Sequence, residues 1–233
     1  MDEATIQRLN AINQAFYRTT ADEFDQTRGQ PWPGWFRLLL HLNAPVTVLD
    51  VGCGNGRLGV FLSSHTEVTL YHGVDNNSAL LERAREALAH LPAVTLDVRD
   101  IVENPPASGA YDLVALFGVM HHIPGAQRRL DLIQALAQRV RPGGLLAFAC
   151  WRFYEFERFR NRIVPWPEDV SVEVHDYLLD WRRGQTALRY CHYVDDAEHD
   201  ALVNATGLTE IERYRADGFS GTVNQYSILR RSA

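Results

Sequence analysis

Short apolar runs alternate with amphipathic segments through the middle of the chain. The runs are rich in β-branched and aromatic residues, whereas the segments between them carry apolar residues three or four positions apart. This pattern predicts five strands, at 46–51, 68–75, 94–98, 111–117 and 145–150, and three intervening helices, at 58–63, 78–90 and 126–140. Strands and helices that alternate in this way form a parallel sheet with right-handed crossovers.

The two ends of the chain depart from this alternation. Apolar residues at helical spacing predict two helices before the first strand, at 4–17 and 34–42. After residue 150, about forty residues rich in aromatic residues and arginine interrupt the rhythm, where loops that face a ligand lie in such folds. A helix and a closing hairpin follow, at 195–205, 208–214 and 223–229.

The first predicted strand ends in an acid and a glycine-rich turn. Gly52, Gly54 and Gly56 allow a tight turn and a close approach of the backbone to a ligand, which places a binding site at the carboxyl end of this strand. Gly54, Gly56 and Gly59 also match the GxGxxG fingerprint of dinucleotide-binding domains. That spacing alone is weak evidence, and it leaves a nicotinamide or flavin cofactor open.

Asp50 separates the two cofactor classes. Its carboxylate would repel a pyrophosphate in a poorly solvated cleft. S-adenosylmethionine carries no phosphate and bears an ammonium and a sulfonium group, so an acid followed by a glycine turn suits it. The pattern resembles motif I of the class I methyltransferases, which implies a cofactor contact for each of Asp50, Gly52, Cys53, Gly54 and Gly56.

Two further strands end in acids. Asp75, followed by Asn76, is placed to accept hydrogen bonds from ribose hydroxyls. Asp100 and Ile101 occupy the position at which class I methyltransferases hold the adenine amino group and cover its ring, and Phe117 ends the fourth strand beside them. Any one acid could be an ordinary turn or helix-cap residue. Acids at three successive strand ends favour an adenosyl cofactor.

Composition limits the class of protein. A chain of 233 residues suits one α/β domain with an insertion. It contains no apolar run of about 18 residues and no signal-peptide pattern at its start, so we expect a soluble, cytoplasmic protein without a membrane partner. Three widely spaced cysteines predict reduced thiols and no metal site. A net charge of -6 argues against DNA binding and confines any RNA contact to a local surface.

The fourth strand runs into the segment LFGVMHHIPG. It places His121 and His122 at the rim of the predicted cleft, beside the expected methyl group. One or both could contact the methyl acceptor. The alternative is structural, with one histidine capping a loop and the other packing in the core.

Four stretches together resemble the tRNA wobble-uridine carboxymethyl methyltransferase family. They occur in the family's order and read FDQTRGQPWP at 24–33, DVGCGNG at 50–56, VPW at 164–166 and RYCHY at 189–193. The resemblance implies a tRNA substrate whose 5-carboxymethyluridine is methylated by S-adenosylmethionine, with S-adenosylhomocysteine as product, and, as in some relatives, a small zinc-ribbon activator protein. Cys191 replaces an aromatic residue of the family, and 153–189 matches only at VPW.

Arginine and aromatic residues in these motifs are candidates for the acceptor site. Arg28 and Arg189 could each hold a carboxylate through two parallel hydrogen bonds, and with His121 they form the predicted catalytic set. Substrate contacts are also expected from a larger aromatic and histidine set, namely Trp32, His122, Trp151, Trp166, Tyr190 and His192. The alternative roles are core or lid packing for the tryptophans and a solvated surface charge for Arg189.

We therefore expect methyl transfer to a carboxylate by in-line displacement. A carboxylic acid with a pKa of about 4 is ionised at neutral pH and needs no general base, so His121 would orient the acceptor. A small-molecule O- or N-methyltransferase, with a histidine as base, is the first alternative. A catalytically silent protein that binds the cofactor or a protein partner is the second, against which the three strand-end acids argue.

The sequence predicts a doubly wound α/β domain over residues 1–233, with a mostly parallel, seven-stranded sheet. Its expected parts are an N-terminal helical lid, a cofactor-binding core, an acceptor-recognition insertion, and a closing helix and hairpin, at 1–43, 44–150, 151–192 and 193–233.

Overall fold

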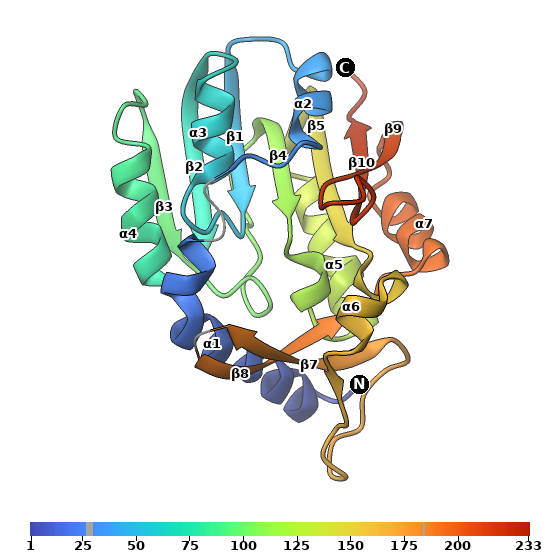
Figure 1. Ribbon diagram of the computed structural model, residues 1–233. Helices are drawn as coiled ribbons and strands as arrows, with labels where there is room; N and C mark the ends of the chain where they lie inside the picture. Colours follow the sequence, from blue (N-terminus) through green and yellow to red (C-terminus); the bar gives the residue numbers. More distant parts are fainter. Residues whose placement is uncertain (27–29, 184) are drawn as a thin grey trace.

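Seven strands form one twisted sheet at the centre of the protein, as Figure 1 shows. A computed structural model describes residues 1–26, 30–183 and 185–233. The strand order is β3-β2-β1-β4-β5-β10-β9. The bounds of these strands are β1 (Val46–Val51), β2 (Val68–Asp75), β3 (Val94–Val98), β4 (Tyr111–Phe117), β5 (Val140–Trp151), β9 (Thr209–Ala216) and β10 (Asn224–Arg230).

The sheet is parallel from β3 to β5, and only β10 runs against its neighbours β5 and β9. The central strand β1 is buried on both faces, as its run of apolar residues requires. The predicted doubly wound, mostly parallel, seven-stranded sheet is confirmed. The largest difference among the strand boundaries is at β5, which already begins at Val140, inside the predicted helix 126–140, and includes the RPGG segment, which the sequence pattern assigns to a turn.

Helices cover both faces of this sheet. One face packs against α5 (Ala126–Ala137) and α7 (Asp196–Ala205), and the other against α2 (Trp35–Leu38), α3 (Arg57–Ser63) and α4 (Ser78–Ala87). The short 3-10 helices η1 (Leu39–His41) and η2 (Met120–His122) follow α2 and β4. None of the helices within the described ranges is long and apolar enough to cross a membrane.

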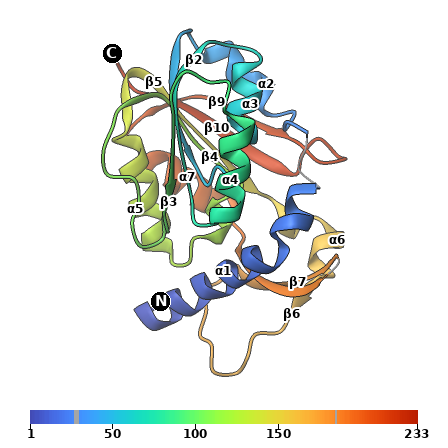
Figure 2. The same cartoon turned by 90° about the vertical axis from the view of Figure 1, so that its left-hand side faces the viewer.

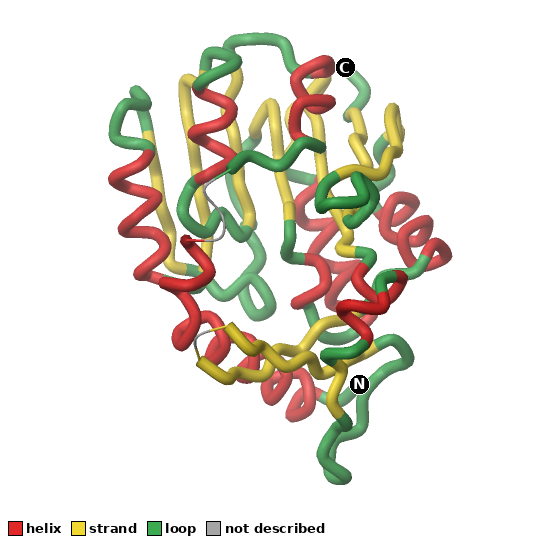
Figure 3. Tube along the Cα trace, in the orientation of Figure 1, coloured by secondary structure: helices red, strands yellow, loops and turns green. Residues whose placement is uncertain are grey.

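A second layer lies at the end toward which the parallel strands point (Figures 1 and 2). It consists of the long helix α1 (Glu3–Gln26) and an antiparallel sheet of β6 (Ile163–Val164), β7 (Asp176–Arg183) and β8 (Gln185–His192). The short helices η3 (Phe153–Glu155) and α6 (Glu157–Arg160) lead into this layer. Helix α1 extends nine residues beyond the predicted end at 17. Loops of the large sheet lie between the two layers (Figure 3).

Candidate active site

The glycine-rich turn after β1 forms one wall of a cavity at the carboxyl edge of the sheet. Gly54 has a φ of +53°, and a methyl group added to it would meet no heavy atom within 4 Å, so the turn exposes bare backbone there. Gly56 has a φ of +77°, and a methyl group there would lie 3.1 Å from the Cβ of Ala84. Gly54 is therefore positioned for a ligand, and Gly56 for packing of the turn against α4.

The cavity brings together nearly all the residues predicted to bind the cofactor. Those that line it are Asp50, Gly52, Cys53, Gly54, Asp75, Asn76, Asp100, Ile101 and Phe117. Gly56 lies behind the wall. Trp32 and His122, which the sequence assigns to the acceptor, line the same cavity. Those two side chains therefore face the cofactor side of the site.

Asp75 and Asp100 each accept more than one hydrogen bond from neighbouring groups. Asp75 accepts from the backbone N–H groups of Gly54 and Asn77, each at 2.9 Å. Burial raises the pKa of Asp75, and these N–H groups oppose the shift. Asp100 accepts from the side-chain amides of Asn10 at 2.7 Å and Gln14 at 2.9 Å. Helix α1 is thus attached to the end of β3.

Asp50 is the most perturbed acid of the cavity. Burial raises its pKa to about 7, although the Tyr71 hydroxyl donates a hydrogen bond to Asp50 Oδ2 at 2.6 Å and lowers it. The nearby carboxylate of Asp75 raises this pKa and the guanidinium of Arg57 lowers it. A cationic ligand in the cavity would relieve the cost of this buried charge.

Several lining residues were not anticipated from the sequence. Helix α1 contributes Asn10, Asn13 and Tyr17, which recur at helical spacing on its polar face. The first turn of α3 contributes Arg57, whose guanidinium lies 5.4 Å from the ring centre of Trp32 and 5.2 Å from that of Trp35. The polar residues at helical spacing in the first predicted helix were the sequence signal that could have placed α1 at the cavity.

The cavity wall suits S-adenosylmethionine in its polar groups. Trp35 Nε1 and Asn13 Oδ1 are buried there and find no hydrogen-bond partner among residues 1–26, 30–183 and 185–233, which leaves a donor and an acceptor for a ligand. Asp75 has the position for the ribose and Asp50 for a positive charge, and Arg57 can pair with an amino-acid carboxylate. The residues present therefore fit this cofactor.

A second cluster adjoins the cavity and contains the predicted acceptor residues His121, Trp151 and Arg189. The rings of His121 and His122 are 4.0 Å apart, and Trp151 lies 5.2 Å from His121. The guanidinium of Arg189 lies 4.9 Å from the ring centre of Trp151 and 5.2 Å from that of Phe16 on α1. The cluster thus lies between the cofactor cavity, which His122 lines, and strand β8, which carries Arg189.

His122 is held by the second layer. Its Nε2 lies 2.7 Å from the Tyr17 hydroxyl, and its Nδ1 lies 3.2 Å from Asn13 Nδ2 and from the carbonyl oxygen of Tyr190. This contact set favours the structural role for His122. His121 is the histidine that faces Trp151.

The other predicted substrate residues lie elsewhere. Tyr190 and His192 are 0% and 2% exposed and hydrogen-bond to Asp176, so neither presents a face to a base in this conformation. Trp166 donates to the carbonyl oxygen of Asp176 at 3.2 Å and is half-buried. Arg28 falls outside the described residues.

The fold also brings together two groups of side chains of the types that can bind a metal ion. The first is His121, His122 and Cys191, and the second is Glu173, Asp176 and His192. Within each group the nitrogen, oxygen or sulfur atoms lie within 4.8 Å of one another. Protein groups already contact members of both, since Tyr17 contacts His122 and Arg129 contacts Glu173. Spacing along the chain could not reveal either group. We assign no ion to them.

Comparison with known proteins agrees with this geometry. Residues 49–146 match the family model described as a methyltransferase domain. The chain is 32% identical over 135 residues to mouse (Mus musculus) tRNA (carboxymethyluridine(34)-5-O)-methyltransferase ALKBH8, covering 58% of this chain and 19% of that protein. It is 29% identical over 156 residues to the Saccharomyces cerevisiae tRNA (carboxymethyluridine(34)-5-O)-methyltransferase, covering 67% of this chain and 53% of that protein. The chain thus spans about a fifth and about half of these relatives.

Solved structures share the fold. A SAM-dependent methyltransferase from Methanosarcina mazei superimposes with a TM-score of 0.68 at 16% identity, over 87% of this chain and 99% of that one. The strand order, the glycine turn with its three acids and the matched family model lead to one assignment. Residues 49–146 are a methyltransferase domain, and the chain has the fold of the class I S-adenosylmethionine-dependent methyltransferases.

Proposed function

We propose that this protein methylates the carboxylate of 5-carboxymethyluridine at the wobble position of tRNA. Two curated relatives that carry this activity in their names support the proposal, as do the four sequence motifs of that family. The observation that carries it is Arg189, because its surroundings suit a carboxylate better than a neutral acceptor.

Arg189 is a buried cation for which the described residues provide no acidic partner. It is 8% exposed and lies between the rings of Phe16 and Trp151. Among the side chains that the structure describes, no carboxylate lies within 4.0 Å of it, and its positive charge lowers the pKa of the Cys191 thiol, which burial raises. A buried charge of this kind is costly unless a counter-ion joins it. An acceptor carboxylate would supply two hydrogen bonds and the opposite charge.

The reaction requires alignment more than proton transfer. S-adenosylmethionine, when bound, supplies an electrophilic methyl group on sulfonium sulfur. A carboxylate with a pKa of about 4 is already nucleophilic at neutral pH. Arg189 would hold one edge of this carboxylate, and His121 would orient it toward the cavity. Helix α1, fixed to Asp100 by Asn10 and Gln14, would exclude water from the site.

The net charge and the cysteines of the chain bear on its partners and its location. The net charge of -6 leaves little positive surface for a whole tRNA, so a small zinc-ribbon activator protein would supply RNA contacts. We place the reaction in the cytoplasm, in keeping with the chain's three free cysteines.

Transfer assays on tRNA test the proposal. Bulk tRNA from a strain lacking this protein is incubated with the purified protein and radiolabelled S-adenosylmethionine, with and without the activator. We expect label in a base-labile ester of 5-carboxymethyluridine, seen by mass spectrometry of nucleosides. Cofactor binding without transfer to tRNA would favour the silent protein, and label in a small-molecule extract would favour the first alternative.

The pH dependence separates acceptor classes. At saturating cofactor, ionisation of a carboxylate acceptor adds no slope between about pH 6 and 8, whereas a phenol or amine assisted by a histidine gives a rate that climbs with pH. A climbing rate would contradict carboxylate transfer.

A further inference from the structure

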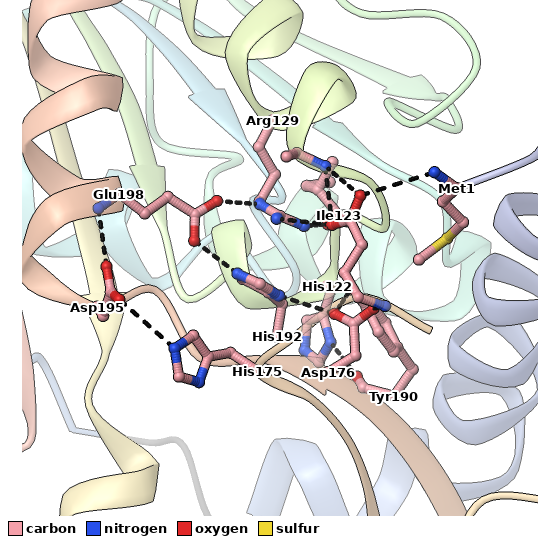
Figure 4. A network of polar contacts seen from close by, with 12 residues as sticks. Met1, His122, Ile123, Arg129, His175, Asp176, Tyr190, His192, Asp195 and Glu198 are labelled. Carbon is pink, nitrogen blue, oxygen red and sulfur yellow. Dashed lines mark hydrogen bonds and ion pairs between the residues drawn. The ribbon is translucent and has the colours of Figure 1, made fainter. Parts of the chain in front are cut away.

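A buried chain of polar contacts joins the small sheet to the core of the protein (Figure 4). Asp176 at the start of β7 accepts hydrogen bonds on Oδ1 from the Tyr190 hydroxyl at 2.8 Å and from His192 Nδ1 at 2.7 Å. The other nitrogen of His192, Nε2, lies 2.6 Å from Glu198 Oε2 on α7. His192 is therefore held between two carboxylates from two different elements.

The chain continues into the catalytic core. Glu198 Oε1 accepts from Arg129 Nε of α5 at 2.6 Å, and Arg129 is 1% exposed. Arg129 also donates to the carbonyl oxygen of Ile123 at 3.0 Å and to Glu173 at 3.1 Å. Ile123 lines the cofactor cavity and follows the two histidines of η2. The network thus connects β8 with the loop that carries His121.

The charges of the network favour a protonated His192. Three carboxylates face it or its partners, from Glu173, Asp176 and Glu198, against two cations, the guanidinium of Arg129 and the N-terminal ammonium of Met1, which lies 4.0 Å from Glu173 Oε1. Burial by itself lowers the pKa of His192, but the hydrogen bonds to Asp176 and Glu198 outweigh it and raise the pKa above 6.5, with Arg129 opposing. Both ring nitrogens can donate only in the imidazolium form.

Strand geometry relates this network to the acceptor site. Alternate residues of a strand point to opposite faces, so Tyr190 and His192 lie on one face of β8 and Arg189 and Cys191 on the other. The first face holds the network. The second places Arg189 against Trp151 and against Phe16 of α1. A movement of β8 at His192 would displace Arg189.

We propose that protonated His192 is a positioning residue, which fixes β8 between Asp176 and Glu198 so that Arg189 meets the acceptor carboxylate. The inference deepens the proposed function and rests on it for the role of Arg189. Its contribution is full below the ordinary imidazole pKa of 6.5 and is lost as the pH rises through the raised pKa of the folded protein. The second layer therefore loosens on the alkaline side.

A double-mutant cycle tests whether His192 acts through Arg189. In His192→Gln we expect kcat/KM for tRNA to fall about tenfold while affinity for S-adenosylhomocysteine stays within about twofold. In an Arg189→Ala background the same change should cost less than about twofold. Equal losses in both backgrounds, or a parallel loss of cofactor affinity, would overturn the proposal.

A pH profile separates positioning from general stability. Wild-type kcat should decline on the alkaline side at saturating cofactor, His192→Gln should lack this decline, and Glu198→Gln should shift it to lower pH. The matched control is His199→Gln, because His199 is a buried histidine of α7 that contacts Ser227 instead of this network. It should keep the wild-type decline. An unshifted decline in Glu198→Gln would contradict the assignment.

Hydrogen exchange of β8 amides provides a readout that needs no acceptor. Protection of the 188–192 amides, measured relative to their intrinsic base-catalysed exchange rate at each pH, should fall as the pH rises in the wild type and should be low at every pH in His192→Gln. If wild-type protein shows this pH dependence of protection but transfers no methyl group to tRNA, the proposed function fails, and the fixing of β8 by protonated His192 stands. If this protection is the same at every pH in the wild type, the positioning role of His192 fails whatever the acceptor.

Discussion

The cofactor cavity and the acceptor cluster are adjacent but are built in different ways. The cavity takes its acids and glycines from the ends of consecutive parallel strands, where the chain turns at the edge of the sheet. The acceptor cluster is the group of side chains around Arg189 that adjoins this cavity. It takes Phe16, Trp151 and Arg189 from three elements that are distant in sequence. Local turns thus determine the first region, whereas the second depends on the docking of α1 and the small sheet.

This difference predicts separable functions. Substitutions in the turn region should change cofactor affinity, and substitutions in the second layer should change turnover with the cofactor still bound. The following predictions are ordered by the size of the expected effect.

Asp75→Ala should cause the largest loss. It removes the ribose acceptor and also the carboxylate that holds the N–H groups of Gly54 and Asn77. We expect the affinity for S-adenosylhomocysteine to fall about a thousandfold, measured by isothermal titration. Asp131→Ala on the exposed face of α5 is the matched control and should bind normally. A small loss in Asp75→Ala would remove this acid from the cofactor site.

Arg189→Ala should separate the two regions most clearly. We expect kcat/KM for tRNA to fall about a hundredfold, because a charge-assisted hydrogen bond to the acceptor is lost, while cofactor affinity stays within about twofold. Arg189→Lys should recover part of the activity, since it restores the charge without the planar fork. Loss of cofactor affinity in step with turnover would show that the two regions are not independent.

Cofactor affinity should depend on pH through Asp50. Its pKa of about 7 means that the carboxylate loses its charge as the pH falls below 7, so affinity for a cationic ligand should decrease about tenfold from pH 8 to pH 6. Titrations in two buffers of different ionisation enthalpy should show proton release on binding near pH 7. Asp50→Asn should abolish this slope; a slope that persists would assign it to another group.

Two glycines of the same turn should respond differently. Gly56→Ala forces a methyl group to 3.2 Å from the Cα of Ala84, and should lower the free energy of unfolding by about 1 kcal/mol more than Gly54→Ala does. Gly54→Ala meets open space, so its main effect should be a few-fold loss of cofactor affinity. Thermal unfolding and titration measure both quantities. The reverse ranking would show that Gly54 packs against protein.

The cofactor region was predictable because strand period and turn chemistry are local. The ends of β1, β2 and β3 were identified from apolar runs, and the acids at those ends line the cavity. The contribution of α1 was missed, since amides on a helix face have no motif and their position over the cavity depends on docking to Asp100.

The acceptor region was predictable by residue type but not by orientation. Arg189 and His121 both lie against Trp151. Tyr190 and His192, assigned to substrate contact, turn to the opposite face of β8, where Asp176 holds both. The elements that pack on a strand determine which of its faces is buried. Here the residues that pack behind β8, Glu198 and its partner Arg129, come from helices that are distant from β8 in the sequence or belong to the core.

The most direct test of the account is a crystal structure with S-adenosylhomocysteine and 5-carboxymethyluridine. We predict adenosine against Asp75 and the nucleoside carboxylate within hydrogen-bond distance of Arg189, at about 2.8 Å, with its free oxygen directed at the cofactor sulfur. A carboxylate bound elsewhere, with Arg189 still enclosed by Phe16 and Trp151, would contradict the central claim that this arginine receives the methyl acceptor.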